Sequence, residues 1–356
     1  MLTLGRWIRD RARTTPARVA IDCRGVETTY AELDVRSERL AAGLLDAGLV
    51  PGDRVATLTA TSTEHVVVFF ACAKAGLILM PLNTRLAPPE LRYQLDDAEP
   101  ALLLSSPEHA ELAGSLHERV AGPEDVVAQS NYLPLGAAPR DGDGLLLVYT
   151  SGTTGKPKGA LLTHANCFWT NLSFDRVAGL AAEDTVLQVL PQFHVGGWNV
   201  QPLLAWWKGA TVVLEPAFDP ARALALIAEK RVTTMMGVPA TYLFMAQEPG
   251  FATADLRTLR RAVVGGAPMP EALLETWHER GVEIVQGYGL TEAAPNVLCL
   301  PPEDATRKRG FAGKPYPHVD VALRDVESGD LLEGPAEGEL LVKGPNVFAG
   351  YWRNPE

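Results

Sequence analysis

Cysteine is scarce in this sequence of 356 residues, and no apolar run is long and continuous enough to cross a membrane. The four cysteines lack the spacing of a metal site or a disulfide scaffold: Cys23, Cys72, Cys167 and Cys299. The longest apolar stretch, 66–82, is interrupted by Lys74 and falls short of the ~20 residues that a transmembrane helix needs. We therefore predict a cytoplasmic protein with reduced thiols, no transmembrane segment, and a buried strand or helix at 66–82 that includes Cys72.

Clustered positive charge is also missing. Lysine and arginine number 32 against 43 acidic residues, and no basic block stands out, so we do not expect a nucleic-acid partner. The segment 1–13 is charged and lacks the apolar core of a signal peptide. No basic amphipathic helix supports membrane binding, although peripheral membrane contact and an oligomer both stay open. The remaining composition is that of an ordinary globular protein, long enough for two or more packed units.

Strand-like and helix-like segments alternate along most of the chain, which predicts an α/β fold of mostly parallel sheets covered by helices. Helices are expected to begin at the capping box Thr29–Glu32 and at Asp219-Pro220. The expected strands are 54–60, 77–82, 145–149, 185–190, 210–215, 232–236, 262–264, 282–285, 319–324 and 338–342. We predict a first βαβ subdomain at 1–143, including a surface connection from 105, a second at 144–309, and a small β subdomain at 310–356.

A loop rich in glycine, hydroxyl and lysine follows the expected strand 145–149. It reads Thr150-Ser151-Gly152-Thr153-Thr154-Gly155-Lys156-Pro157-Lys158-Gly159. Glycines let the backbone turn tightly and bring N–H groups toward an anion, and the hydroxyls and lysines add further donors. It is not a Walker A loop, because Gly155-Lys156 is followed by Pro157 instead of Ser or Thr. The composition indicates a flexible clamp for a polyphosphate.

Four more segments carry candidate functional residues in a defined order: Leu190–Trp198, Val238–Thr241, Val263–Pro268 and Gln286–Glu292. Taken singly, each has an ordinary structural interpretation. His194 after an apolar run is usually structural, and Gly265-Gly266 alone suits a plain strand–turn–helix junction. Two late segments, 338–345 and 350–356, carry no assigned chemistry.

Together with the loop at 150–159, these segments resemble the acyl-adenylate-forming (AMP-binding) enzymes, which include acyl-CoA synthetases, peptide-synthetase adenylation domains and luciferases. The resemblance extends from about residue 29 to the last residue and implies the large N-terminal domain of such an enzyme, without its small C-terminal lid domain. It further implies two half-reactions. A carboxylate attacks the α-phosphorus of ATP to give acyl-AMP and pyrophosphate, and the thiol of CoA then attacks the acyl carbonyl and releases AMP.

The resemblance assigns roles residue by residue. Catalytic residues would be Thr150, Lys158, His194, Thr291 and Glu292, and Mg²⁺ would be held by Thr150 and Glu292 with the phosphates. Nucleotide-binding residues would be Thr150, Ser151, Gly152, Thr153, Thr154, Gly155, Lys158, Gly265, Gly266, Ala267, Pro268, Gln286, Gly287, Tyr288, Gly289 and Thr291, with Tyr288 stacked on adenine. Acyl-binding residues would be His194, Val195, Trp198, Val238, Thr241, Gly265, Gly289 and Leu290.

The acyl pocket points to an apolar acid. His194 stands where amino-acid-activating relatives carry Asp, and the wall 241–245 offers no cation for a second carboxylate. The segment His194–Trp198 resembles fatty-acid enzymes in which the matching tryptophan gates a tunnel, so we expect a medium- or long-chain fatty acid. Three alternatives stay open: a CoA ligase for an aryl or other apolar acid, a ligase that loads a carrier protein, and a binding module without catalysis.

In the family, the segment after Asn354-Pro355-Glu356 leads to a Thr-Gly-Asp that grips the ribose, then to a hinge and a small domain with a catalytic lysine. Because these elements do not follow in this sequence, we expect weak or no overall turnover from this chain, with the acyl and adenine pockets largely formed.

Overall fold

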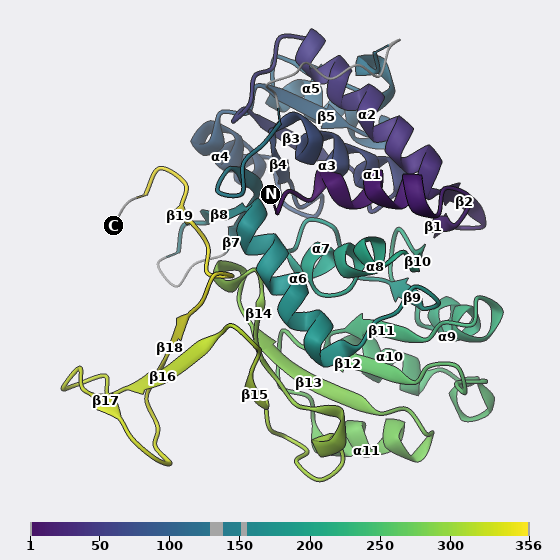
Figure 1. Ribbon diagram of the computed structural model, residues 1–356, viewed down its shortest axis with the longest axis vertical. Helices are drawn as coiled ribbons and strands as arrows, with labels where there is room; N and C mark the ends of the chain where they lie inside the picture. Colours follow the sequence, from purple (N-terminus) through teal and green to yellow (C-terminus); the bar gives the residue numbers. More distant parts are fainter. Residues whose placement is uncertain (1, 129–137, 151–154, 355–356) are drawn as a thin grey trace.

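Two large sheets and one small sheet organise the chain in the computed structural model, which describes residues 2–128, 138–150 and 155–354. Figure 1 shows the helices α2, α3, α4 and α5 with one large sheet in its upper half, and α9, α10 and α11 with the other in its lower half. The predicted α/β class of helix-covered, mostly parallel sheets is confirmed.

The upper sheet has seven strands in the order β19-β8-β7-β4-β3-β5-β6. Its strands are β3 (Arg54–Leu58), β4 (Ile78–Pro81), β5 (Leu102–Ser105), β6 (Val120–Ala121), β7 (Gly144–Thr150), β8 (Lys158–Thr163) and β19 (Gly350–Tyr351). α2 (Tyr30–Asp46) precedes β3 in the sequence. Between the strands lie α3 (Thr63–Ala75), α4 (Pro88–Ala98), α5 (Ala110–Leu116), and the short 3₁₀ turns Pro107–His109 and Pro123–Val126. β4, β3, β5, β6 and β7 pair in parallel, whereas β8 pairs antiparallel with both β7 and β19.

The lower sheet has nine strands in the order β15-β14-β13-β12-β11-β9-β10-β1-β2. Its strands are β1 (Val19–Cys23), β2 (Val26–Thr29), β9 (Thr185–Gln188), β10 (Thr211–Leu214), β11 (Thr234–Gly237), β12 (Arg261–Val264), β13 (Ile284–Gly289), β14 (Asn296–Cys299) and β15 (Lys314–Pro315). The helices are α1 (Gly5–Thr14), α6 (His164–Ala178), α7 (Gly196–Asn199), α8 (Pro202–Lys208), α9 (Pro220–Glu229), α10 (Pro239–Gln247) and α11 (Glu271–Glu279), with 3₁₀ turns at Phe251–Thr253, Thr291–Ala293 and Pro302–Asp304.

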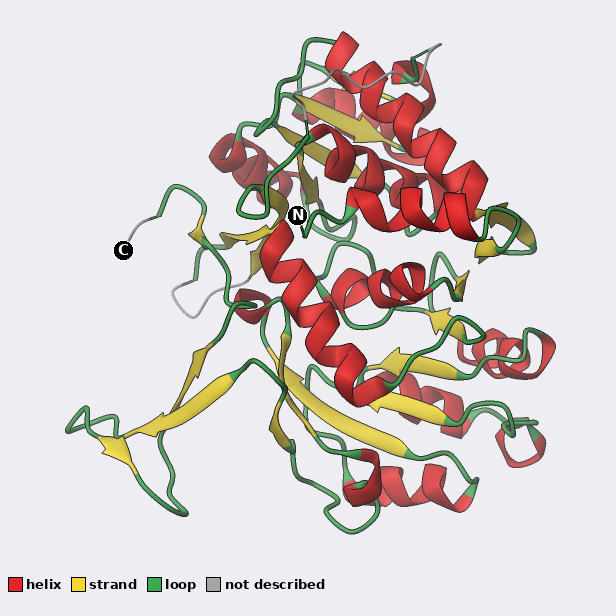
Figure 2. Ribbon diagram, viewed as in Figure 1, coloured by secondary structure: helices red, strands yellow, loops and turns green. Residues whose placement is uncertain are grey.

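The third sheet is a small arm of β16 (Asp320–Arg324), β17 (Leu331–Leu332) and β18 (Glu339–Lys343). Figure 2 shows these strands and their loops standing apart from the helices. Val321 and Val342 pack against the main core and anchor the arm to the body.

The sheets divide the chain differently from the predicted boundaries. β7 and β8 belong to the seven-stranded sheet, because the apolar run of β7 pairs with β4, with Leu146 opposite Leu79. The first strands, β1 and β2, instead form an edge of the nine-stranded sheet. The boundary at 143/144 is therefore wrong: the segment from 105 does not connect one sheet to the other, and the loop at 150 does not open the second subdomain. The predicted β subdomain 310–356 is also divided, since β15 belongs to the nine-stranded sheet and β19 to the seven-stranded sheet.

Local signals at the helix starts behave as predicted. At α2, the Glu32 amide donates to Thr29 Oγ1 at 3.2 Å and the Thr29 amide donates to Glu32 Oε2 at 2.7 Å, which completes the capping box. At α9, Asp219 caps the helix and Pro220 occupies its first position. The apolar stretch 66–82 forms most of α3 and then β4, both buried.

The sequence predicted that Cys72 is buried, that the thiols are reduced and that no segment crosses a membrane. Cys72 is fully buried, as predicted, and all four cysteines are free thiols. Within the described residues, the helices are all too short or too polar to cross a membrane.

Two buried histidines make the stability depend on pH. His65 accepts or donates a hydrogen bond at 3.0 Å through Nε2 with Thr57 Oγ1, and the Leu4 amide donates to His164 Nδ1 at 3.2 Å. Burial lowers the pKa of His65 to about 3 and that of His164 to about 4. The unfolded chain protonates both imidazoles below about pH 6.5, whereas the folded chain does not, so the stabilisation is complete above that pH.

We therefore predict that the free energy of unfolding falls as the pH is lowered from about 6.5 toward 4. Each histidine contributes a slope of up to about 1.4 kcal/mol per pH unit. Urea denaturation at closely spaced pH values measures the slope. His65→Gln should flatten it by one such contribution, while His109→Gln, at a partly exposed position, should leave it unchanged; equal slopes in all three proteins would contradict the assignment.

Candidate active site

A cavity of about 840 Å³ lies where the carboxyl ends of parallel strands from both large sheets converge. The nine-stranded sheet contributes the segments that follow β9, β10, β11, β12 and β13, and the seven-stranded sheet contributes Thr59–Thr61 after β3 and Thr84-Arg85 after β4. Ligands of open α/β sheets bind at such carboxyl ends. The cavity therefore draws on both sheets.

The end of β13 and the turn after β12 form one wall of the cavity. Gly265, Gly266, Gly287, Gly289 and Thr291 all line it. A Cβ on Gly289 would lie 1.9 Å from the Pro295 carbonyl oxygen, so this position accepts no side chain. The closely packed glycines leave flat backbone surface for a ring to lie against.

Tyr288 lies on the same wall with 43% of its surface exposed, although it is a large aromatic residue. An exposed ring beside glycine backbone suits stacking against a planar base. The predicted adenine role of Tyr288 is compatible with this placement and stays a prediction.

The predicted polyphosphate loop connects β7 to β8, and these two strands pair as an antiparallel hairpin. Thr150 ends β7 directly opposite Lys158, which begins β8, and Gly155 in the turn has a φ of 88°, a conformation that favours glycine. Ser151, Gly152, Thr153 and Thr154 lie outside the described residues, so their nucleotide-binding roles stay predictions.

The hairpin meets the Thr291-Glu292 turn across the boundary between the sheets. Thr150 Oγ1 donates to Glu292 Oε1 at 3.5 Å, although the two residues are 142 positions apart. These are the two residues predicted to hold Mg²⁺. Magnesium commonly uses one or two carboxylates and completes its shell with substrate phosphates and water, so this pair fits such an ion. The described residues contain no group of three or more His, Cys, Asp or Glu that would form an all-protein metal site.

His194 lines the cavity and stands against Phe193, with ring centroids 4.7 Å apart. Burial lowers the pKa of His194, and the nearby Arg85 guanidinium lowers it further. The imidazole is therefore neutral at pH 7 and can either donate or accept a hydrogen bond.

Arg85 is a cavity residue that sequence reasoning missed. Its guanidinium carbon lies 5.8 Å from the centre of the Phe193 ring. The sequence argument considered only the wall 241–245, which indeed contains no cation. Arg85 reaches the cavity from the seven-stranded sheet, after β4. The available signal was its position just after a predicted strand, the same signal that marked His194.

The acyl side of the cavity is mostly apolar. Val195, Val238, Thr241, Gly265, Gly289 and Leu290 line it, and their acyl-binding roles stay predictions. Val200, Met236, Phe244 and Leu298 extend the apolar surface. This surface excludes water and suits a hydrophobic acyl group.

Eight of the predicted residues that the structure describes do not line the cavity. Four of them lie at the β7–β8 hairpin or in the turn that it meets: Thr150, Gly155, Lys158 and Glu292. The other four are Gln286, Ala267, Pro268 and Trp198. Gln286 is buried as a structural link, with Oε1 accepting from the Met269 amide at 3.2 Å and Nε2 donating to the Phe311 carbonyl at 3.3 Å. Ala267 and Pro268 are exposed beyond the glycine turn. Trp198, the predicted tunnel gate, is fully buried in the core behind the cavity wall.

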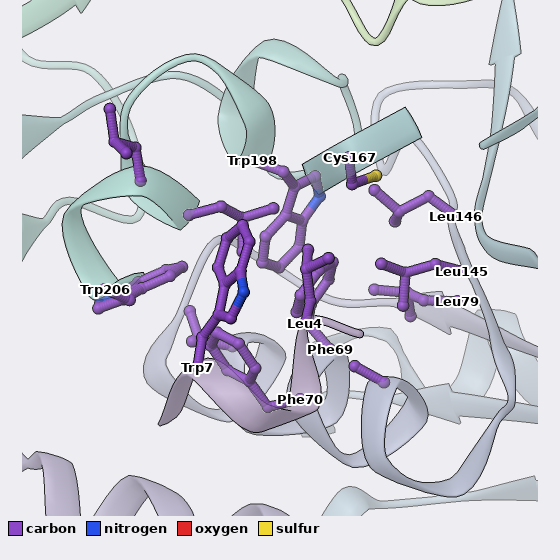
Figure 3. Packing of buried hydrophobic residues seen from close by; sticks show 14 of the residues in the cluster. Leu4, Trp7, Phe69, Phe70, Leu79, Leu145, Leu146, Cys167, Trp198 and Trp206 are labelled. Carbon is purple, nitrogen blue, oxygen red and sulfur yellow. The ribbon is translucent and has the colours of Figure 1, made fainter. Parts of the chain in front are cut away.

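Packing explains the position of Trp198. Its ring stacks on Phe69 of α3 at 4.7 Å, meets His65 edge-on at 5.2 Å, and donates from Nε1 to the Gln192 carbonyl at 2.6 Å. Figure 3 shows Trp198 beside Phe69 within the cluster that also holds Trp7 and Trp206. This packing gives no support to the gate interpretation, because the side chain on the short helix α7 lies in the core and not in the cavity lining. The gate role of Trp198 stays a prediction.

Comparison with known proteins agrees with this site. The model of the AMP-binding enzyme family matches residues 8–352. The chain belongs to this family. Its curated relatives include several acid–CoA ligases and one fatty acid–[acyl-carrier-protein] ligase, so it falls among the adenylate-forming CoA ligases of this family, which use ATP and CoA.

Three relatives illustrate the range of acids within the family. The chain is 42% identical to a feruloyl-CoA synthase of Amycolatopsis sp and 38% identical to an indoleacetate–CoA ligase of Aromatoleum aromaticum, in both cases over 99% of this chain and 72% of the relative. It is 34% identical to the long-chain-fatty-acid–CoA ligase FadD13 of Mycobacterium tuberculosis, over all of this chain and 73% of that protein.

Solved structures show the same domain. The inhibitor-bound N-terminal domain of FACL13 from Mycobacterium tuberculosis superposes with a TM-score of 0.92 at 33% identity, covering 100% of this chain and 92% of that one. ATP-bound MatB from Rhodopseudomonas palustris gives a TM-score of 0.92 at 32% identity, covering 100% of this chain and 72% of that one. The resemblance inferred from the motifs is confirmed, and the part of the family that this chain matches includes the N-terminal domain of FACL13.

Proposed function

We propose that this AMP-binding enzyme activates an apolar carboxylic acid with ATP and transfers the acyl group to CoA, and that the acid is aromatic. The composition of the cavity is the observation that supports this proposal. One wall holds the glycine backbone, Tyr288 and Thr291, the opposite region is apolar, and the Thr150–Glu292 pair stands beside them. A nucleotide and an acid lying in one cavity meet the need of acyl-AMP formation for two aligned reactants.

Charge is the main obstacle to the first half-reaction, because the carboxylate and the triphosphate repel each other. Lys158 supplies a positive charge at the hairpin, and the hydroxyls of Thr150 and Thr291 supply donors near the phosphates. Mg²⁺ bound by Glu292 would neutralise further phosphate charge. Fixed donors of this kind stabilise the transition state more than water does, since they need no reorganisation.

His194 and Tyr288 orient the reactants in this proposal. Tyr288 stacks on the adenine ring, while the neutral imidazole of His194 holds the acid near the α-phosphate through one hydrogen bond. The apolar residues of α10 and β11 hold the remainder of the acyl group and keep water from the mixed anhydride.

Two observations favour an aromatic acid over a fatty acid. Trp198 is fully buried and does not line the cavity, which weakens the motif-based argument for a long chain. The two relatives named for aromatic acids are also more similar to this chain than the relative named for long-chain fatty acids. The fatty acid is the second candidate, because the apolar wall and the similarity to FadD13 both suit it.

A thermal-shift titration with non-hydrolysable acyl-adenylate analogues tests the proposal. A ligand that binds only the folded state raises the melting temperature once its concentration exceeds Kd, and no turnover is needed. We expect the cinnamoyl analogue to stabilise the chain most, ahead of decanoyl and palmitoyl, with alanyl weakest. A larger shift with decanoyl or palmitoyl would replace the aromatic acid with a fatty acid, and no shift with any analogue would contradict the adenylate site.

A further inference from the structure

Tyr351, in a late segment to which the sequence assigned no chemistry, contacts the candidate metal residue directly. Its hydroxyl donates to Glu292 Oε1 at 2.7 Å, shorter than the 3.5 Å bond from Thr150 to the same oxygen. Within the described part of the chain, no hydrogen bond reaches the other carboxylate oxygen, Oε2. The carboxylate is thus held by one oxygen and presents the second.

The backbone fixes Tyr351 at this place from two sides. β19 pairs with β8 beside the phosphate hairpin, with Tyr351 opposite Ala160, and the Trp352 amide donates to the Gly159 carbonyl at 2.7 Å. Three residues before Tyr351, the Phe348 amide donates to the Glu292 carbonyl at 2.8 Å. The segment 348–352 therefore ties the hairpin of one sheet to the Thr291-Glu292 turn of the other.

The same ring also contacts the lysine of the hairpin. Lys158 Nζ lies 5.2 Å from the centre of the Tyr351 ring, within the range of a cation–π contact. No ion pair joins Lys158 to Glu292 in the residues that the structure describes. One side chain thus contacts the cation with its ring face and the anion with its hydroxyl, and the two charges stay separately available to a ligand.

We infer that Tyr351 is a positioning residue for Glu292: by occupying Oε1 it aims Oε2 at the magnesium and phosphate of bound ATP. The inference rests on the proposed function and deepens the metal assignment. Carboxylates that ligate metals are commonly oriented by a hydrogen bond to their other oxygen, and loss of that partner typically weakens metal binding 10- to 100-fold. Because its bond to Glu292 is long, the Thr150 hydroxyl can turn toward the ligand.

The test measures how much free Mg²⁺ is needed for half of the stabilisation that ATP gives in a thermal-shift assay. Tyr351→Phe removes the hydroxyl and keeps the ring that Lys158 contacts, and we expect it to raise that Mg²⁺ concentration about tenfold. Tyr149→Phe is the matched control. Tyr149 lies on β7 of the same sheet as Tyr351, and its hydroxyl donates to Asp97 Oδ2 of α4 at 2.6 Å. Because that carboxylate is outside the site, the Mg²⁺ requirement of this variant should change by less than about twofold.

Tyr351→Phe can also be introduced into a Glu292→Gln protein, in which the proposed metal ligand is already lost. The amide oxygen can still accept from Tyr351 but binds the metal poorly, so adding Tyr351→Phe to it should change the Mg²⁺ requirement by no more than about twofold. A Tyr351→Phe protein with a lower melting temperature and an unchanged Mg²⁺ requirement would overturn the inference and leave Tyr351 a structural role. Wild-type protein that binds ATP independently of Mg²⁺, or not at all, would overturn the inference together with the metal assignment.

Discussion

Glu292→Ala should weaken Mg²⁺-dependent ATP binding by about 100-fold, because it removes the carboxylate that would hold the metal beside the hairpin. The structure places Glu292 on the boundary between the two large sheets, within hydrogen-bonding distance of Thr150 from one side and Tyr351 from another. Glu292 is half-buried, and its loss leaves the Tyr351 hydroxyl free to bond water. We therefore expect little change in the stability of the ligand-free protein.

Calorimetric titration of ATP in the presence of Mg²⁺ and in the presence of a chelator measures the effect. The wild-type protein should lose most of its affinity when Mg²⁺ is removed, and Glu292→Ala should bind weakly under both conditions. Glu279→Ala makes the same change in net charge at an exposed position of α11, and should behave as wild type. Equal Mg²⁺ dependence in Glu292→Ala and wild type would exclude Glu292 as the metal residue.

The predicted segments that reach the cavity could be found from the sequence because they are encoded locally. His194, Thr241 and Thr291 each follow an apolar strand within a few residues, and a strand with its adjoining turn is recognisable from composition alone. Glycine runs such as Gly265-Gly266 mark where backbone approaches closely, for a reason that needs no distant partner.

Contacts between segments that are distant in the sequence could not be predicted from such local patterns. Nothing local states that β7 pairs with β4 in the seven-stranded sheet, since a buried strand of Leu and Val pairs equally well with several partners. The wrong boundary at 143/144 follows from this. Arg85 was overlooked for the same reason, because its place in the cavity depends on how the two sheets meet.

Trp198 shows a second limit, because a motif match says where a residue lies in the chain but not which way its side chain points. In α7, a helix of one turn, a small difference in backbone direction decides whether an indole faces the cavity or the core. Here Phe69 and His65 of α3 provide an aromatic site that the ring fills completely. The chemistry of indole suits both places, so only packing discriminates between them.

Trp198→Ala should accordingly lower the free energy of unfolding by about 3–5 kcal/mol, the usual cost of deleting a large buried aromatic side chain. The change removes the stack on Phe69, leaves the Gln192 carbonyl without its donor, and opens a cavity in the core. Trp198→Phe keeps a ring in place and should cost about 1–3 kcal/mol, mostly for the lost hydrogen bond. Chemical denaturation of the ligand-free protein gives both values.

Trp169→Ala is the control for truncating a tryptophan in general. Trp169 is only half-buried and meets His318 edge-on at 5.0 Å, so its removal should cost less than half as much as that of Trp198. A gate and a core residue then differ in a measurable way. A core residue changes the stability of the empty protein, whereas a gate changes only which acyl-adenylate analogue binds best. If Trp198→Ala kept wild-type stability and shifted the preference toward palmitoyl, the side chain would reach the acyl group after all, and the fatty acid would become the better candidate substrate.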